Sequence, residues 1–204
     1  SLKTVLAFDF GASSGRAIKA TFDGEKISYE EIHRFDNIPI QENGHTYHNA
    51  DMIFEEIKKA IDKAGKVDSL AFDTWGVDYG LFDKNGKLLN QPYHYRDCRT
   101  ENAVEKAAEA QDLSELYKLT GNQIMGINTL FQLISDNKLN DADKIIFMPD
   151  LFGYLLTGNA VSEYSIASTS QMLNPVTKKW CKEVTDKFNI DTDKFAPLTT
   201  SSTV

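Results

Sequence analysis

The sequence predicts an α/β fold in which a mixed sheet begins with an antiparallel β-meander and is flanked by helices. Three observations support this prediction. Three β-rich stretches follow one another at the start of the chain, separated by short glycine-containing turns. A stretch with helical spacing of apolar residues comes next, and an apolar strand follows it directly.

The meander is predicted from residues 4–10, 16–22 and 26–35, with turns at the glycine-rich stretch 11–15 and at Asp23-Gly24. Asn49 or Asp51 can cap the following helix, and Gly65 stands where it should end. Its apolar positions recur at helical spacing: Ile53, Ile57, Ala60, Ile61 and Ala64. A strand over residues 67–72 after this helix predicts a crossover to a parallel neighbour in the same sheet.

The rest of the chain is predicted to be mostly helical. A hairpin is expected from strands 79–82 and 87–89 around a polar turn, and a further core strand over 145–148. Helices are expected over residues 101–110, 113–119, 129–137, 150–156 and 179–188. We expect one domain over residues 1–195, followed by a loop or the start of a linker over 196–204, where Pro, Thr and Ser predominate.

Composition excludes several classes of protein. The 204 residues are 41% hydrophobic and 25% charged, as in an ordinary globular domain. A net charge of -8 repels nucleic acid. No stretch approaches the roughly 20 apolar residues of a membrane helix, so a cytoplasmic protein is expected. Cys98 and Cys181 show no zinc or disulfide spacing, and we interpret both as free thiols.

The first candidate site is the turn at residues 9–16, whose glycines allow backbone N–H groups to approach an anion and whose serines add donors. The stretch lacks the Gly-Lys-Ser/Thr of a Walker A loop. A plain hairpin turn is the alternative. Asp9, at the end of the first strand, is placed to hold Mg²⁺ near the phosphates, unless it is only a surface aspartate. The predicted phosphate ligands are Ala12, Ser13, Ser14, Gly15 and Arg16.

The second candidate site follows the strand at residues 67–72, because crevices in α/β sheets form at the carboxyl ends of strands. Asp73 and Asp78 can accept hydrogen bonds from sugar hydroxyls, and Trp75 beside the bare backbone of Gly76 can cover a sugar face. A strand-end turn with a core tryptophan is the alternative. Arg96 lies in the polar stretch of residues 95–100, where two arginines flank an aspartate. This stretch either binds sugar hydroxyls or forms a local salt-bridge network. The four histidines are interpreted as structural or surface residues.

Several motifs together resemble the FGGY carbohydrate kinases, and most closely the members that act on L-rhamnulose. They are FDFGASSGR at residues 8–16, DTWGVD at 73–78, YRDCRT at 95–100, MPDLF at 148–152, LTG at 156–158 and EYSIAST at 163–169. These matches span nearly the whole chain in the order of the family.

The resemblance implies an actin-like, ribonuclease-H-like fold in two domains, of which this chain is the amino-terminal, sugar-binding one. It implies transfer of the ATP γ-phosphoryl group, with Mg²⁺, to the C1 hydroxyl of L-rhamnulose. Residues 12–16 would hold the ATP phosphates, Asp9 the magnesium and Gly76 the sugar through its backbone. The catalytic base, an aspartate, and the adenosine site are expected beyond Val204, in a carboxy-terminal kinase domain. We therefore expect no catalytic residue within this chain, and an inactive protein if it stands alone.

Three alternatives stay open. The first is a kinase of the same family whose substrate is another ketose or polyol, such as fuculose or xylulose. A ribonuclease-H-like nuclease would use Asp9, Asp73 and Asp78 to hold two metals, although the acidic charge argues against it. A non-catalytic sugar or nucleotide sensor would keep the fold without the base.

Overall fold

The computed structural model describes residues 1–203, and their contacts separate into two compact units. Unit 1 comprises residues 1–40 and 48–75, and unit 2 comprises residues 41–47 and the chain from Gly76 onward. No helix among the described residues has both the length and the apolar character needed to cross a membrane.

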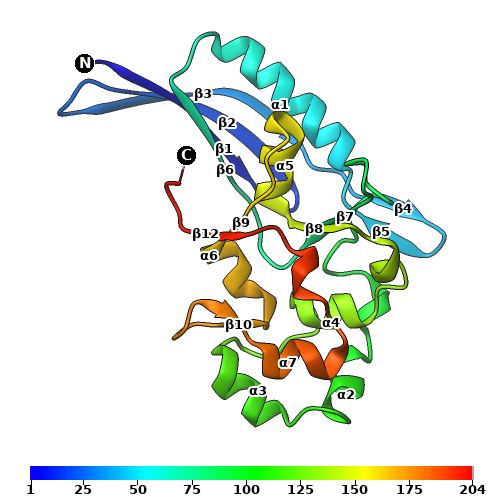
Figure 1. Cartoon of the computed structure of the whole chain (residues 1–204). Helices are drawn as coiled ribbons and strands as arrows, with labels where there is room; N and C mark the ends of the chain where they lie inside the picture. The colour runs from blue at the N-terminus through cyan, green and yellow to red at the C-terminus, as the bar shows by residue number, and fades with distance from the viewer. Residues whose placement is uncertain (204) are drawn as a thin grey trace. The chain divides into compact units, whose positions relative to one another are not determined.

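Unit 1 is built on a four-stranded mixed sheet with the order β3-β2-β1-β6 (Figure 1). The predicted meander is confirmed as β1 (Lys3–Phe10), β2 (Ser14–Phe22) and β3 (Ile27–Asp36), which pair in antiparallel fashion. β6 (Ser69–Asp73) adds to β1 in parallel, as the predicted crossover requires. Alternate β1 side chains, Leu6, Phe8 and Phe10, are buried on one face of this sheet.

The crossover helix α1 (Ala50–Ala64) packs on β3 and β2 and buries its apolar stripe. Asn49 caps its first turn, because Oδ1 accepts a hydrogen bond from Met52 N at 3.0 Å. Gly65, with φ 65°, ends it and donates its N–H to Ile61 O. The predicted helix and both of its ends are confirmed.

The sheet of unit 2 differs from the predicted hairpin. β7 (Tyr79–Phe82) pairs in antiparallel fashion with β8 (Lys144–Phe147), a partner that the sequence does not predict. The predicted hairpin is formed in part: Asp83 N donates to Lys87 O, Leu89 N donates to Leu81 O, and Phe82 makes an isolated bridge with Leu88. The polar turn is present, since Asp83 accepts hydrogen bonds from Asn85 N and Lys87 N. All four β7 residues are buried, as are Ile145, Ile146 and Phe147 of β8.

The helices of unit 2 surround one hydrophobic core that includes Leu130, Phe131, Ile145, Phe147 and Val184. Its α-helices are α2 (Ala103–Ala108), α3 (Leu113–Thr120), α4 (Thr129–Ile134), α5 (Met148–Thr157), α6 (Tyr164–Ala167) and α7 (Lys182–Thr185). Its 3₁₀ turns are η1 (Cys98–Thr100), η2 (Leu139–Asp141), η3 (Ser168–Ser170), η4 (Asp186–Phe188) and η5 (Thr192–Lys194). Short hairpins are formed by β4 (Ile40–Glu42) with β5 (His45–Tyr47) and by β10 (Leu173–Asn174) with β11 (Lys179–Trp180).

Two predicted segments need correction. The helix expected over residues 179–188 begins as β11, because Asn174 Oδ1 caps a turn that brings residues 179–180 back onto β10, and only α7 and η4 are helical. The loop expected over 196–204 contains β12 (Leu198–Thr199), which pairs in parallel with β9 (Ser162–Glu163). Val204 lies outside the described residues, and the domain boundary at residue 195 stays a prediction.

Candidate functional site

The turn between β1 and β2 is tighter than the sequence suggests. Asp9 and Arg16 lie within strands as directly paired residues, and only residues 11–13 lie outside them. Gly11 N donates to Ser14 O at 2.8 Å and closes the turn. The predicted phosphate ligands therefore divide between this turn and the first three residues of β2.

Asn37, directly after β3, holds the carbonyl groups of the turn. Its backbone N donates to Ser13 O at 2.9 Å, and its side-chain Nδ2 donates to Gly11 O at 3.0 Å. Asn37 is 4% exposed, and its Oδ1 is buried without a hydrogen-bond partner among the described residues. Because two carbonyl oxygens are tied to Asn37, they are not available to repel an anion at the turn.

Gly15 is required by packing inside unit 1. A methyl group at this position would lie 2.6 Å from Phe35 Cε1 and 2.8 Å from Phe10 Cδ1. Both distances are well inside van der Waals contact. The bare backbone at position 15 therefore makes room for two aromatic rings, whatever its part in binding phosphate.

Two carboxylates stand at the carboxyl ends of neighbouring parallel strands. Asp9 of β1 and Asp73 of β6 are paired in register, so their side chains project from the same face of the sheet. Asp73 is exposed, and the Asp9 side chain is 48% exposed. Asp9 Oδ2 accepts a hydrogen bond from Arg16 Nε at 2.9 Å and lies 2.8 Å from Arg16 Nη2. These hard oxygen donors fit Mg²⁺, with Arg16 as the competing partner.

Trp75 is partly buried at the end of unit 1. The ring centroids of Trp75 and His48 lie 4.5 Å apart at an interplanar angle of 34°. His48 is 1% exposed, so it packs under the indole as a structural residue.

Asp78 has an internal role in unit 2. It is 0% exposed, with Oδ1 accepting from Gln132 Nε2 at 2.8 Å and Oδ2 from Tyr95 N at 3.2 Å. Its backbone carbonyl accepts from Met148 N at 3.1 Å. A buried carboxylate with both oxygens engaged is not placed to bind a sugar hydroxyl or a metal. Burial thus removes one of the three aspartates that a two-metal nuclease would need.

The arginine cluster separates into an exposed and a buried member. Arg96 is exposed, with its guanidinium 5.5 Å from the Tyr95 ring centroid. The Arg99 side chain is 7% exposed and lies 3.1 Å from Asp136 Oδ2, with Nη2 also donating to Tyr79 Oη at 3.2 Å. Burial raises the pKa of Tyr79 well above its usual value. Burial lowers the pKa of Arg99, but its interactions with Tyr79 and Asp136 raise it more. The salt-bridge interpretation therefore applies to Arg99.

One group of potential metal ligands lies away from these residues. Among residues 1–203, only His45, Asp97 and Cys98 bring three such groups together, with ligand atoms within 4.8 Å of one another. Asp97 Oδ1 accepts from Thr46 N, and Oδ2 accepts from Arg99 N and contacts His45 Nδ1 at 3.0 Å. Capping η1 and joining it to β5 accounts for this arrangement, and we assign no metal to it.

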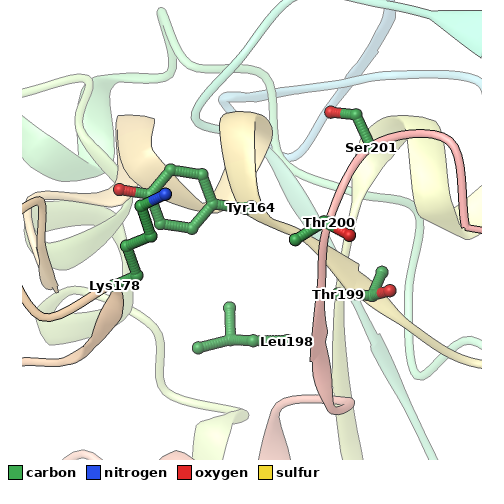
Figure 2. A pocket seen from close by; sticks show the side chains of 6 residues that line it. All are labelled: Tyr164, Lys178, Leu198, Thr199, Thr200 and Ser201. Carbon is green, nitrogen blue, oxygen red and sulfur yellow. The ribbon is translucent and has the colours of Figure 1, made fainter.

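A cavity of about 370 Å³ opens in unit 2 beside β12 (Figure 2). Its lining consists of Tyr164, Lys178, Leu198, Thr199, Thr200 and Ser201. The one charged group is the Lys178 ammonium, 5.6 Å from the Tyr164 ring centroid. None of the predicted site residues lines the cavity, and the Ser201 hydroxyl already donates to Glu163 Oε1, so we assign no catalytic role to its lining.

Asp150 is a titrating group in the first turn of α5. Its Oδ2 accepts a hydrogen bond from Glu163 N at 2.9 Å. Burial and the nearby Glu163 charge raise the pKa of Asp150 to about 6, although this hydrogen bond lowers it. Between pH 4 and 6 Asp150 therefore binds more protons in the folded protein than in the unfolded chain, so its own contribution to the free energy of unfolding falls as pH rises through this window.

Replacing Asp150 with asparagine is expected to stabilise the protein above pH 6, because the amide keeps an acceptor for Glu163 N without an ionised group to bury. The expected gain in unfolding free energy at pH 7.5 is about 1–3 kcal/mol, shrinking toward zero near pH 4. Urea unfolding at several pH values measures it. Asp141→Asn, on an exposed residue, is the control. A gain that does not depend on pH would contradict this explanation.

Sequence motifs do not identify Asn37, Thr129 or Gln132 as site residues, and Thr169 lies inside a motif without an assigned role. Each contacts the predicted segments through hydrogen bonds across long sequence separations. Of these four residues, Asn37 alone has a local signal in the sequence: it is a polar residue that directly follows the third strand of the meander, which leads the chain back to the first turn.

Comparison with known proteins identifies a family and a fold for the chain. Residues 4–204 match the profile of the FGGY family of carbohydrate kinases, N-terminal domain. The rhamnulokinase of Ligilactobacillus salivarius (strain UCC118) is 40% identical over 209 residues, covering 100% of this chain and 43% of the relative. That of Lactiplantibacillus plantarum (strain ATCC BAA-793 / NCIMB 8826 / WCFS1) is 39% identical over 209 residues, with the same coverage of 100% and 43%. The chain thus spans less than half the length of these curated relatives.

A solved structure shows the same fold at much lower identity. The crystal structure of gluconate kinase from Lactobacillus acidophilus matches with a TM-score of 0.84 at 18% identity, covering 98% of this chain and 42% of that one.

Proposed function

The chain belongs to the FGGY family of carbohydrate kinases, and we propose that it is the sugar-binding part of an enzyme that phosphorylates L-rhamnulose at its C1 hydroxyl with ATP. The products are rhamnulose 1-phosphate and ADP. The observation that carries the proposal is the similarity to rhamnulokinases along the whole chain. The α/β fold is the actin-like, ribonuclease-H-like fold of such kinases. The proposal places the reaction in the cytoplasm, where ATP is supplied.

The turn between β1 and β2 holds the ATP phosphates in this proposal. Ser13 and Ser14 add hydroxyl donors to the backbone N–H groups of the turn, and Arg16 adds a cation half-exposed to solvent. Asn37 supports this role, since it holds the carbonyl groups that would otherwise repel the phosphate oxygens.

Asp9 is the proposed residue for Mg²⁺, directly or through water, with Asp73 beside it at the same edge of the sheet. A bound Mg²⁺ would neutralise charge on the phosphates. Arg16 competes with Mg²⁺ for Asp9 Oδ2, and phosphate oxygens are the natural new partner for an arginine that leaves this oxygen.

For the sugar, the proposal assigns contacts to Asp73 and Arg96, an apolar face to Trp75, and backbone contacts to Gly76. Asp73 and Arg96 are exposed and available to hydroxyl groups. Asp78, predicted as a further contact, instead positions the segment from within, because it is fully buried.

The base that accepts the C1 hydroxyl proton is proposed to belong to a carboxy-terminal kinase domain, with the adenosine site. Phosphoryl transfer depends on positioning all of these groups at once. The chain alone is therefore proposed to be inactive.

The experiment measures ADP release by the kinase in which this chain is joined to a complete carboxy-terminal domain, and by the chain alone, with L-rhamnulose, fuculose, xylulose and no sugar. We expect turnover only with the two-domain protein, and the highest kcat/KM for L-rhamnulose. A higher kcat/KM for another ketose favours the alternative substrate. Sugar binding without turnover in the two-domain protein would favour a sensor. Full activity of the chain alone would contradict the proposal that the base and the adenosine site belong to the carboxy-terminal domain.

A further inference from the structure

The backbone at Val77 is strained. Its φ of 65° lies in the left-handed region, which is unusual for a β-branched residue and costs on the order of 1–2 kcal/mol. Asp78 N donates to Gly76 O at 2.8 Å, so residues 76–78 form a three-residue γ-turn of the rare, strained kind. Such a conformation persists only where the surrounding structure imposes it.

Two threonine hydroxyls hold Val77 in this conformation. Val77 N donates to Thr169 Oγ1 at 3.0 Å, and Thr129 Oγ1 donates to Val77 O at 2.7 Å. Thr169 Oγ1 also donates to Ile166 O at 2.7 Å, which fixes the orientation of the hydroxyl so that its lone pair faces Val77. Thr129 is 0% exposed, so its bond is protected from water. Both polar groups of the strained residue are thus bound by side chains distant in sequence.

The residues on either side of Val77 are fixed as well. A methyl group at Gly76 would lie 3.0 Å from Thr169 Cγ2 and 3.2 Å from Thr169 Oγ1, so the threonine packs directly against the glycine backbone. On the other side, Gln132 and the backbone of Tyr95 bind the buried Asp78 carboxylate. Gln132 Nε2 also donates to Ile127 O, and this second hydrogen bond fixes the side-chain amide of Gln132 beside Asp78.

We propose that Thr169, with Thr129, is a positioning residue for sugar binding: its hydroxyl holds the γ-turn that sets the orientation of the Gly76 backbone. The inference rests on the proposed function, in which the Gly76 backbone contacts the sugar. The strained conformation of Val77 sets the direction of the Gly76 peptide. A relaxed, extended backbone at Val77 would turn that peptide away from its present orientation. A sugar whose hydroxyls bind a backbone group depends on that orientation to well within 1 Å.

The test compares Thr169→Val, which keeps the shape but lacks the hydroxyl, with Thr169→Ser, which keeps the hydroxyl. In the two-domain kinase, Thr169→Val should lower kcat/KM for L-rhamnulose by about ten- to a hundredfold while leaving the KM for ATP within about twofold. Thr169→Ser should restore most of the loss. Thr177→Val, on an exposed threonine, is the matched control, and thermal unfolding shows whether each variant is folded.

A second measurement tests the structural half without activity. The amide of Val77 should exchange its hydrogen at least about tenfold faster in Thr169→Val than in the wild type, because its acceptor is gone. If Thr169→Val does not fold, Thr129→Val removes the donor to Val77 O and carries the kinetic measurement from the other side of the turn. Unchanged kcat/KM for the sugar, equal losses for sugar and ATP, or unchanged exchange at Val77 would each overturn the inference. A wild-type kinase that does not phosphorylate the sugar would instead refute the proposed function, while the exchange measurement still decides on Thr169.

Discussion

Replacing Arg99 with methionine is expected to lower the free energy of unfolding by about 3–5 kcal/mol, because it leaves the buried Asp136 carboxylate without its cation. The Asp136 side chain is 2% exposed, so water cannot replace the guanidinium. Arg99 Nη2 also donates to Gln132 Oε1 at 2.9 Å, and its guanidinium carbon lies 3.9 Å from the Tyr93 ring centroid. Urea unfolding of the chain, followed by tryptophan fluorescence, measures the change.

The control is Arg96→Met, which removes an exposed arginine three residues away and should change stability by less than about 0.5 kcal/mol. Adding Asp136→Asn to Arg99→Met removes the orphaned charge and should recover part of the loss. Equal destabilisation by Arg96→Met, or no recovery in the double variant, would show that the buried charge is not the cause.

Replacing Asp9 with asparagine in the two-domain kinase is expected to lower kcat by about 10²-fold or more, because the neutral amide is a poor ligand for the Mg²⁺ that would neutralise the phosphates. Higher Mg²⁺ concentration should recover part of the activity if the metal is held less tightly. The measurement is the initial rate of ADP release as a function of Mg²⁺ concentration.

Asp36→Asn makes the same chemical change at the end of β3, on an exposed residue of the same sheet, and should leave the rate within about twofold. Because Asp9 is half-exposed, Asp9→Asn should also leave the unfolding transition nearly unchanged. A rate close to that of the wild type would show that Asp9 is only the partner of Arg16.

The elements that the sequence predicts well are those whose signals are local. Helix α1 carries its cap, its apolar stripe and its terminal glycine within residues 49–65, and the structure has all three. The pairing of β7 with β8 has no such signal, since Gly80 meets Ile146 across more than sixty residues. The sequence therefore predicts the polar turn after β7 and part of the hairpin around it, but not the pairing of β7 with β8.

The candidate site shows the same division. Asp9 and Asp73 can be placed at the edge of the sheet because each follows an apolar strand. The burial of Asp78 cannot be predicted in this way, because it depends on Gln132, fifty-four residues further along the chain. A β-branched residue such as Val77 predicts extended backbone, and the hydrogen bonds that it receives from Thr129 and donates to Thr169 have no local signal in the sequence.

The two glycines of the first turn have different consequences for engineering this protein. At Gly11 a methyl group would lie 3.4 Å from Ser14 O, an ordinary contact, whereas at Gly15 it would overlap Phe35 and Phe10. A library aimed at a different phosphoryl donor can therefore introduce a small side chain at position 11, but must leave position 15 as glycine or redesign the two phenylalanines with it. The packing of Phe10 and Phe35 in the core thus limits which side chains the β1–β2 turn can present to a ligand at the surface.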